Sequence, residues 1–429
     1  MAKETNIRLR DQIIYSVYVR SHTEEGTFNA IAGDLARIKN LGVDTIWFMP
    51  IHPIGVKGKK GSLGCPYANQ DYRTVNPAYG SLQDFKHLVD AIHEYGMKCM
   101  IDVVYNHTSP DSRLAGEHPE WFYHKPDGSF GNRVGDWTDV IDLDYSNRAL
   151  WDYQIESLVQ WACLVDGFRC DVAPLVPLEF WKAAREAVKK VNPDCVWLAE
   201  SVHHGWLMYN RRSGLPCSND YEGYEAFDME YEYDVREAFE DYLEGRTCLS
   251  HYVGLLNFQE AIYPENYIKM RFLENHDVPR IASFARDPEE LINYTAMLYF
   301  LKGSTLLYAG QEFANEHLPS LFEREVFDRD TGTDLSALMQ RLSQIKKREL
   351  SCADHFWGRA DDDSHIAVLN RTDGRKQKLG VFSLKTNSAV VEVEFPDGVY
   401  PNLISGERVI VNGGKLKCEG HPIILSAPV

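Results

Sequence analysis

An arginine and an aspartate stand two residues apart in the otherwise apolar stretch 165–173. Side chains two positions apart on a strand share one face, so Arg169 and Asp171 point the same way, into an interior that is hostile to charge. Burying a charge is costly unless the charge is paired. The pair is therefore either a structural ion pair or part of a reactive site, and residues elsewhere must decide between the two.

Polar side chains also follow three other runs that are predicted to be strands. From Asp171 to Glu200 is 29 residues, the length of one strand-plus-helix unit, so these two carboxylates belong to neighbouring strands. The stretch 98–104 leads to a histidine, and the stretch 267–273 leads to a histidine and a further aspartate. The residues concerned are His107, Glu200, His276 and Asp277.

Carboxylates brought together in this way can cleave a glycosidic bond. One carboxylic acid protonates the leaving oxygen, and a carboxylate attacks or shields the developing oxocarbenium carbon. A single Asp or His at a strand end is as often a cap or a loop tether. Four such ends in chain order favour a shared site.

The elements that must position these side chains alternate between strand and helix. The predicted strands are 13–19, 45–50, 98–104, 165–173, 195–199, 226–233, 267–273 and 304–309. The predicted helices are 28–41, 81–95, 148–164, 177–191, 235–243, 289–301 and 335–349. Eight such strands predict an α/β fold with a closed (β/α)8 TIM barrel over roughly residues 10–350. An open doubly wound sheet is the alternative, but no G-x-G-x-x-G follows a strand.

Two further parts are expected beside the barrel. The stretch 107–147 after the third strand is several times longer than a usual loop, which predicts a small excursion subdomain. Short alternating runs at 366–369, 378–383, 390–395, 408–411 and 422–425 predict a C-terminal antiparallel β-sandwich, with a hairpin turn at 412–414. The division is 1–106 with 148–350 for the barrel, 107–147 for the excursion and 355–429 for the C-terminal part.

Composition limits the partners. Sixty-three Asp+Glu against 45 Lys+Arg give a formal charge of −18, which repels nucleic acid and is compatible with neutral substrates. No run approaches the roughly 20 apolar residues of a membrane span, and the first residues lack an apolar signal core, so we predict a cytoplasmic protein without a membrane partner. Nine scattered cysteines without C-x-x-C spacing are predicted to be reduced.

Four ordered motifs resemble the α-amylase family of retaining α-glycosidases. They are DVVYNH at 102–107, GFRCDVA at 167–173, Glu200 closing WLAE, and ENHD at 274–277. The segment 66–72, PYANQDY, is similar to the loop after the second strand in that family. The resemblance extends over the barrel, the excursion and the C-terminal part.

The resemblance implies a role for each matching residue. Asp171 would be the nucleophile, and Glu200 would be the general acid and then the base. Burial near other carboxylates would keep Glu200 protonated near neutrality, while Arg169 would keep Asp171 ionised. Asp102, inside its strand, would tether the others. Sugar contacts are expected from Tyr67, His107, His276 and Asp277, of which Asp277 would also stabilise the transition state.

No cofactor is predicted. Asn106 is a calcium ligand in many family members, and oxygen partners exist in the excursion at Asp136, Asp139, Asp142 and Asp144. The residues after the nucleophile, 172–175, read VAPL in place of the Lys-His that often follows, and this departure argues against calcium and puts substrate preference in doubt. His203 and His204 lack a third metal ligand at suitable spacing, so the metal prediction is none.

We therefore expect a glycoside hydrolase that acts with retention on α-1,4-linked glucans or malto-oligosaccharides. The alternatives within the family are a transglycosylase, an isomerase or an α-1,6-glucosidase. A non-catalytic carbohydrate-binding relative is a further alternative, but such a protein is expected to have lost catalytic carboxylates. No pattern in the sequence reports the oligomeric state.

Overall fold

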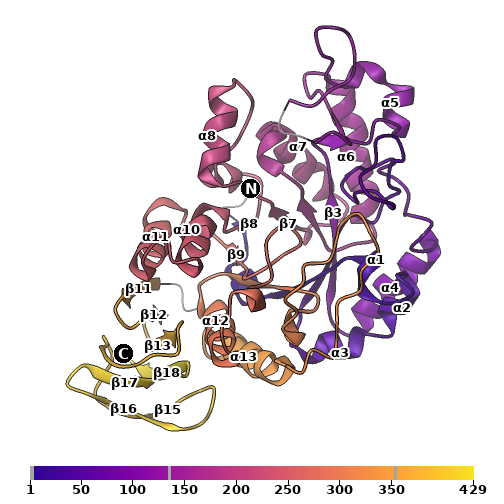
Figure 1. Ribbon diagram of the computed structural model, residues 1–429. Coiled ribbons are helices and arrows are strands. Elements are labelled where there is room, and N and C mark those ends of the chain that lie inside the picture. Colours follow the sequence, from indigo (N-terminus) through magenta and orange to yellow (C-terminus); the bar gives the residue numbers. More distant parts are fainter. Residues whose placement is uncertain (1–3, 134–136, 352–354) are drawn as a thin grey trace.

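The computed structural model describes residues 4–133, 137–351 and 355–429, and its centre is a closed parallel barrel (Figure 1). The strand order around the barrel is β1-β10-β9-β8-β7-β6-β3-β2. The strands are β1 (Ile13–Val17), β2 (Thr45–Phe48), β3 (Lys98–Val103), β6 (Gly167–Cys170), β7 (Val196–Ala199), β8 (Met229–Tyr231), β9 (Lys269–Arg271) and β10 (Ser304–Tyr308). The predicted (β/α)8 architecture is confirmed.

The barrel strands are buried on both faces. β1, β2 and β10 are buried at every position, as expected for parallel strands with helices outside and side chains filling the interior. Ile14, Trp47 and Met100 belong to the cluster that fills the interior. The sixth strand, which the sequence predicts over 226–233, is only three residues long.

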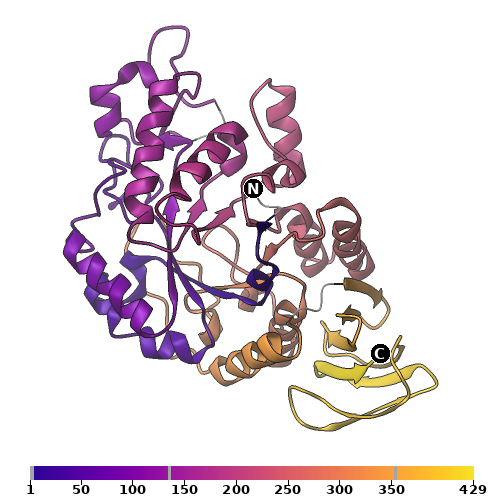
Figure 2. The same cartoon turned by 180° about the vertical axis from the view of Figure 1, so that it is seen from behind.

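Helices surround the barrel (Figures 1 and 2). They are α1 (Val19–His22), α2 (Phe28–Ala32), α3 (Leu35–Asn40), α4 (Leu82–Glu94), α6 (Arg148–Ala162), α7 (Leu178–Val188), α8 (His204–Arg212), α9 (Asp220–Gly223), α10 (Tyr233–Leu243), α11 (Leu249–Ile262), α12 (Pro288–Phe300) and α13 (Ser336–Arg348). Ser81 caps α4, in a capping box with Asp84. The predicted helix 28–41 is two helices, because α2 ends at Ala32, with Gly33 as its C-cap, and Asp34 is the N-cap of α3. The helices α1, α8, α9 and α11 were not predicted.

The excursion leaves the barrel after β3 and returns at α6. Its two short strands, β4 (His107–Thr108) and β5 (Ile141–Asp142), pair antiparallel, with His107 opposite Asp142. It also contains α5 (Arg113–Glu117) and a 3-10 turn at Pro119–Trp121. The pairing holds the start of the excursion against its end, directly above β3.

The C-terminal part consists of two four-stranded antiparallel sheets, ordered β11-β12-β13-β18 and β14-β17-β16-β15. The strands are β11 (His355–Asp361), β12 (Ile366–Thr372), β13 (Lys376–Ser383), β14 (Ser388–Glu392), β15 (Gly398–Pro401), β16 (Arg408–Asn412), β17 (Lys415–Glu419) and β18 (Ile423–Pro428). Residues of both sheets form one core. The β-sandwich is thus confirmed, although β11, β15 and β17 were not predicted. The predicted hairpin turn joins β16 to β17, with Gly413 and Gly414 at φ 59° and 66°.

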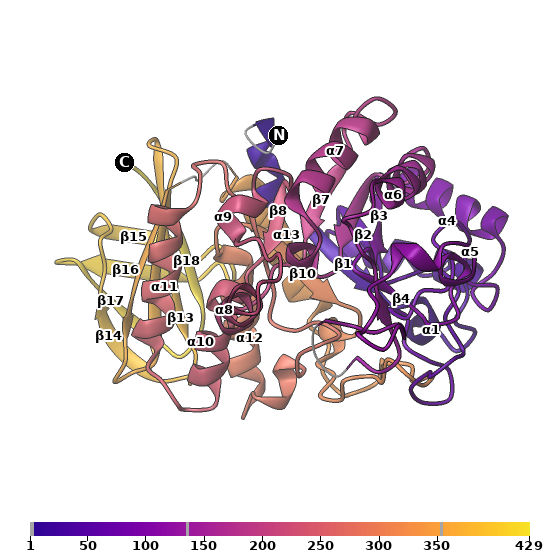
Figure 3. The same cartoon turned by 90° about the horizontal axis from the view of Figure 1, so that it is seen from above.

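The sandwich packs against α11 and α12, on the side of the barrel away from the excursion (Figure 3). Asn257 of α11 donates to the Gly358 carbonyl at 2.7 Å and accepts from its N–H at 2.8 Å. Asn293 of α12 accepts from the Ser383 N–H at 2.9 Å. Within the described ranges, every helix is too short or too polar to cross a bilayer. The boundaries given above for the three parts stay a prediction.

Candidate active site

Three carboxylates meet at the carboxyl end of the barrel. Asp171 directly follows β6 and Glu200 directly follows β7, and the register Cys170↔Ala199 makes them neighbours. Asp277 follows β9 in the loop that precedes α12. All three line one cavity of about 330 Å³, together with Tyr67, His107 and His276. The structure therefore brings together six of the seven predicted site residues around this cavity, and the seventh, Arg169, lies beneath them.

Arg169 is the cation at the centre of the site and is fully buried. Its Nη1 donates at 2.9 Å to both oxygens of Asp102 and at 2.9 Å to Asp171 Oδ1. Its Nη2 lies 2.6 Å from Glu200 Oε1 as an ion pair. Its guanidinium carbon also lies 5.1 Å from the centre of the Trp47 ring. One cation thus serves three buried carboxyl groups, whereas the sequence predicted only the contact with Asp171.

Aromatic and imidazole rings fix the side of the cavity next to Asp277. The Tyr67 hydroxyl donates to Asp102 at 3.0 Å and lies 2.7 Å from His276 Nε2, and the two rings stack at 5.3 Å. His276 Nε2 also lies 3.1 Å from Asp277 Oδ2. These contacts lock the rotamers of the residues that face the cavity, which is what a preorganised site requires. Asp102 contacts Tyr67 and Arg169, which are contacts that a tethering role needs.

Burial raises the pKa values of the two central carboxyl groups. The pKa of Asp171 is raised to about 7, because desolvation and the Asp102 charge outweigh the attraction of Arg169. Desolvation likewise raises the pKa of Glu200 to about 8. The Arg169 charge lowers this pKa, and the Asp171 charge raises it further. Burial thus works against the easy ionisation that the sequence predicted for Asp171, although Arg169 still lowers the pKa of Asp171. Glu200 remains the weaker acid of the two.

The sequence marks Val172 only as the first residue of the 172–175 departure from the family pattern and does not predict that it contacts Glu200. Its N–H donates to Glu200 Oε2 at 2.7 Å. Its φ of 35° is in the left-handed region, which a β-branched residue rarely adopts. This turn directs a backbone donor at the second carboxyl group. No sequence signal predicts such a conformation at a valine.

Two of the candidate calcium ligands already have partners in the protein. Asp139 pairs with Lys60 at 3.0 Å, and Asp142 Oδ2 accepts from the Arg133 N–H at 2.6 Å. Asn106 Nδ2 lies 3.1 Å from the His107 ring. Asp136 lies outside the described residues. Among those that are described, no group of three or more His, Cys, Asp or Glu side chains is arranged to hold a metal ion.

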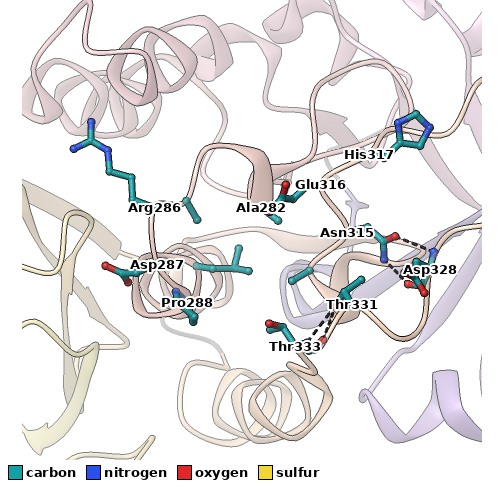
Figure 4. A pocket seen from close by; sticks show the side chains of 13 residues that line it. Ala282, Arg286, Asp287, Pro288, Asn315, Glu316, His317, Asp328, Thr331 and Thr333 are labelled. Carbon is teal, nitrogen blue, oxygen red and sulfur yellow. Dashed lines mark hydrogen bonds between the residues drawn. The ribbon is translucent and has the colours of Figure 1, made fainter.

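A second cavity, of about 450 Å³, lies between the start of α12 and the segment that follows β10 (Figure 4). Asp287 caps α12 by accepting from the Glu289 and Glu290 N–H groups. Asn315 accepts from the Asp328 N–H at 2.9 Å, as Figure 4 shows. None of the predicted site residues lines this cavity.

The model of the family described as "Alpha amylase, catalytic domain" matches residues 12–128 and 115–355, which include every element of the barrel. This chain belongs to the α-amylase family. The model described as "Bacterial Alpha amylase C-terminal domain" matches residues 358–425. The family predicted from the four motifs is therefore confirmed.

Solved structures of the α-amylase family share the whole architecture. An alpha-amylase from Lactobacillus plantarum is 46% identical, with a TM-score of 0.95 over 98% of this chain and 100% of that one. A noncanonic maltogenic alpha-amylase from Thermotoga neapolitana is 32% identical, with a TM-score of 0.87 over 98% of this chain and 100% of that one.

Two curated relatives of this α-amylase family chain are longer proteins. An alpha-amylase of Haloarcula japonica is 28% identical over 71% of this chain and 44% of that protein. An alpha-1,4-glucan:maltose-1-phosphate maltosyltransferase of Myxococcus xanthus is 33% identical over 44% of this chain and 32% of that protein. The match spans less than half the length of either relative.

Proposed function

We propose that this chain hydrolyses α-1,4-glucosidic bonds in malto-oligosaccharides or related glucans with retention of configuration. The observation that carries the proposal is the convergence of Asp171, Glu200 and Asp277 on one cavity above a buried arginine. Two carboxyl groups on neighbouring strands supply the nucleophile and the acid that such cleavage needs. The amylases among the relatives support the same substrate class.

In the proposed reaction, Asp171 attacks the anomeric carbon while Glu200 gives its proton to the leaving oxygen. A glycosyl ester on Asp171 forms as the glycosidic bond breaks. Glu200, now ionised, takes a proton from water, whose oxygen attacks the anomeric carbon and releases Asp171. Asp277, His276 and His107 bind the sugar hydroxyls, and Tyr67 bounds the same subsite.

Transfer to a sugar in place of water is the second candidate, because one relative that matches 44% of this chain is a maltosyltransferase. An isomerase would differ from the proposed α-1,4-hydrolase in the acceptor, and an α-1,6-glucosidase would differ from it in the linkage. A binding protein without catalysis is disfavoured, since all three carboxyl groups are present and line the cavity. A neutral saccharide remains the proposed partner, and the cytoplasmic location remains a prediction.

Product analysis tests this proposal. Maltoheptaose, maltose, isomaltose, sucrose and trehalose are each incubated with the protein in H₂¹⁸O, and the products are identified by mass spectrometry. We expect shorter malto-oligosaccharides that carry ¹⁸O at the new reducing end. Unlabelled, longer products would favour transfer, and an absence of any product would contradict an enzymatic role.

The pH dependence of kcat/KM follows from the two raised pKa values. Asp171 must be ionised to attack, so activity falls as the pH drops through about 7. Glu200 must be protonated, so activity also falls as the pH rises through about 8. We expect a narrow optimum near neutrality in initial-rate measurements on maltoheptaose.

The Asp102→Asn variant tests the physical cause. The Asp102 charge raises the pKa of Asp171. Its removal should therefore move the fall of kcat/KM on the acidic side of the pH profile, the acidic limb, to lower pH. An acidic limb that stays in place would show that Asp102 does not act on the nucleophile.

Calcium removal should leave the activity nearly unchanged. Asp139 is paired with Lys60, and one oxygen of Asp142 accepts from the Arg133 N–H, so both side chains already have partners in the protein. After dialysis against EDTA we expect the rate on maltoheptaose to stay within about twofold. A larger loss that added CaCl₂ restores would contradict the prediction.

A further inference from the structure

One side of the cavity is closed by two loops that are bonded to each other. We call residues 60–64, after β2, and residues 321–323, after β10, the end wall; Lys60, Leu321 and Phe322 line the cavity. The Leu63 N–H donates to the Phe322 carbonyl at 3.0 Å. Ser62 donates to Glu323 through its N–H at 2.7 Å and also through its hydroxyl. The two loops therefore form one surface.

A buried arginine clamps the end wall from behind. Arg20 Nη1 donates to the Gly64 carbonyl at 3.0 Å and to the Leu321 carbonyl at 3.2 Å. Its Nη2 donates to the Leu63 carbonyl at 3.2 Å. Arg20 is only 8% exposed, so its hydrogen bonds are largely protected from competition by water. This cation fixes both loops of the wall at once.

The end wall is also packed tightly and continues to the excursion. A Cβ on Gly61 would lie 2.5 Å from Phe322 Cβ, so the loops touch at a point where only glycine fits. Lys60 Nζ pairs with Asp139 of the excursion at 3.0 Å, and both residues line the cavity. The two loops of the end wall and the excursion thus form a continuous boundary of the cavity.

The topology places the end wall opposite Glu200. β2 and β10 flank β1, and β1 lies across the barrel from β7, which ends at Glu200. Glu200 protonates the leaving oxygen in the proposed reaction, so the leaving sugar lies on its side. The retained sugar then points its O4, which bears the rest of the chain toward the non-reducing end, at the end wall.

We propose that the end wall confines the retained part of the substrate to one or two glucosyl residues, so that the enzyme removes short units from non-reducing ends and does not cut inside long chains. The volume of about 330 Å³ is near the lower limit of the usual range for ligand pockets, roughly 300–1,000 Å³, which suits a short saccharide. Trp137 and Trp206 line the cavity at the other side, near Val172 and Glu200, where the leaving chain extends. This inference rests on the proposed function.

A blocked substrate tests the inference with the unaltered protein. Maltoheptaose and its 4,6-O-ethylidene derivative, blocked at the non-reducing end, are compared by initial rate of bond cleavage and by first products. We expect glucose or maltose as the first product of maltoheptaose, and a rate on the blocked substrate at least about 100-fold lower, because a steric wall discriminates by excluding the longer or bulkier group. Internal cleavage of both substrates at similar rates would overturn the inference while supporting the proposed hydrolysis. An absence of cleavage of either would overturn both.

Variants of the end wall give an independent test. Lys60→Ala combined with Phe322→Ala removes two of its lining side chains, and we expect the ratio of blocked to unblocked rates to rise at least about tenfold. Lys57→Ala, an exposed lysine of the same loop outside the cavity, is the matched control and should keep the original ratio. An unchanged ratio in a folded double variant would show that the wall does not set the product length.

Discussion

Replacing Asp171 with Asn should lower kcat on maltoheptaose by a factor on the order of 10⁴ or more, the usual scale for loss of a nucleophile. The amide is nearly isosteric, so the contact with Arg169 can persist while the ability to form the glycosyl ester is lost. Glu200→Gln should cost a comparable factor on the same substrate, because a glucosyl leaving group needs its proton. Initial rates measure both effects.

Two further measurements separate the roles of these carboxyl groups. Glucosyl fluoride needs little protonation of its leaving group, so it should restore much of the activity of Glu200→Gln and little of that of Asp171→Asn. A 5-fluoroglucosyl fluoride should leave a covalent sugar on the peptide that contains Asp171. The matched control is Asp90→Asn, an exposed position on α4, which should keep full activity. Near-native turnover by Asp171→Asn would refute the assignment.

Arg169→Met should both destabilise the fold and abolish turnover. Arg169 is fully buried and contacts Asp102, Asp171 and Glu200, so its removal leaves three carboxyl groups without a cation. Breaking a buried ion pair by removing one partner costs about 3–5 kcal/mol, and we expect a loss of that order in denaturant unfolding. The lowering influence of Arg169 on the pKa of Asp171 also disappears, so any residual activity should have its acidic limb at higher pH.

Two variants distinguish this role from a general loss of packing. Arg212→Met, on the exposed end of α8, is the control and should change the free energy of unfolding by less than about 0.5 kcal/mol. Asp102→Asn added to Arg169→Met removes one of the unpaired charges and should recover part of the stability without recovering activity. If the double variant were no more stable than Arg169→Met, the electrostatic explanation would fail.

Local sequence patterns were sufficient to predict the barrel and the order of its strands. Parallel strands that are buried on both faces are short apolar runs, and their alternation with amphipathic helices such as α4 is visible without a structure. The helix α11 was missed because it packs on α10 and on β11, so its apolar residues do not form a single face. The short strand β15 was missed because its four residues are only half-buried or exposed, so it contributes no apolar residue to the buried core.

In the candidate site, too, some features follow from the sequence and others only from the tertiary structure. The sequence by itself determined which residues stand at the strand ends, because 29 residues between Asp171 and Glu200 is one repeat of the fold. Only the tertiary structure decided that Arg169 is shared among three carboxyl groups, that Val172 turns its N–H to Glu200, and that Arg20 joins loops more than 250 residues apart. These contacts depend on distances between segments remote in the chain, and local periodicity carries no information about such distances.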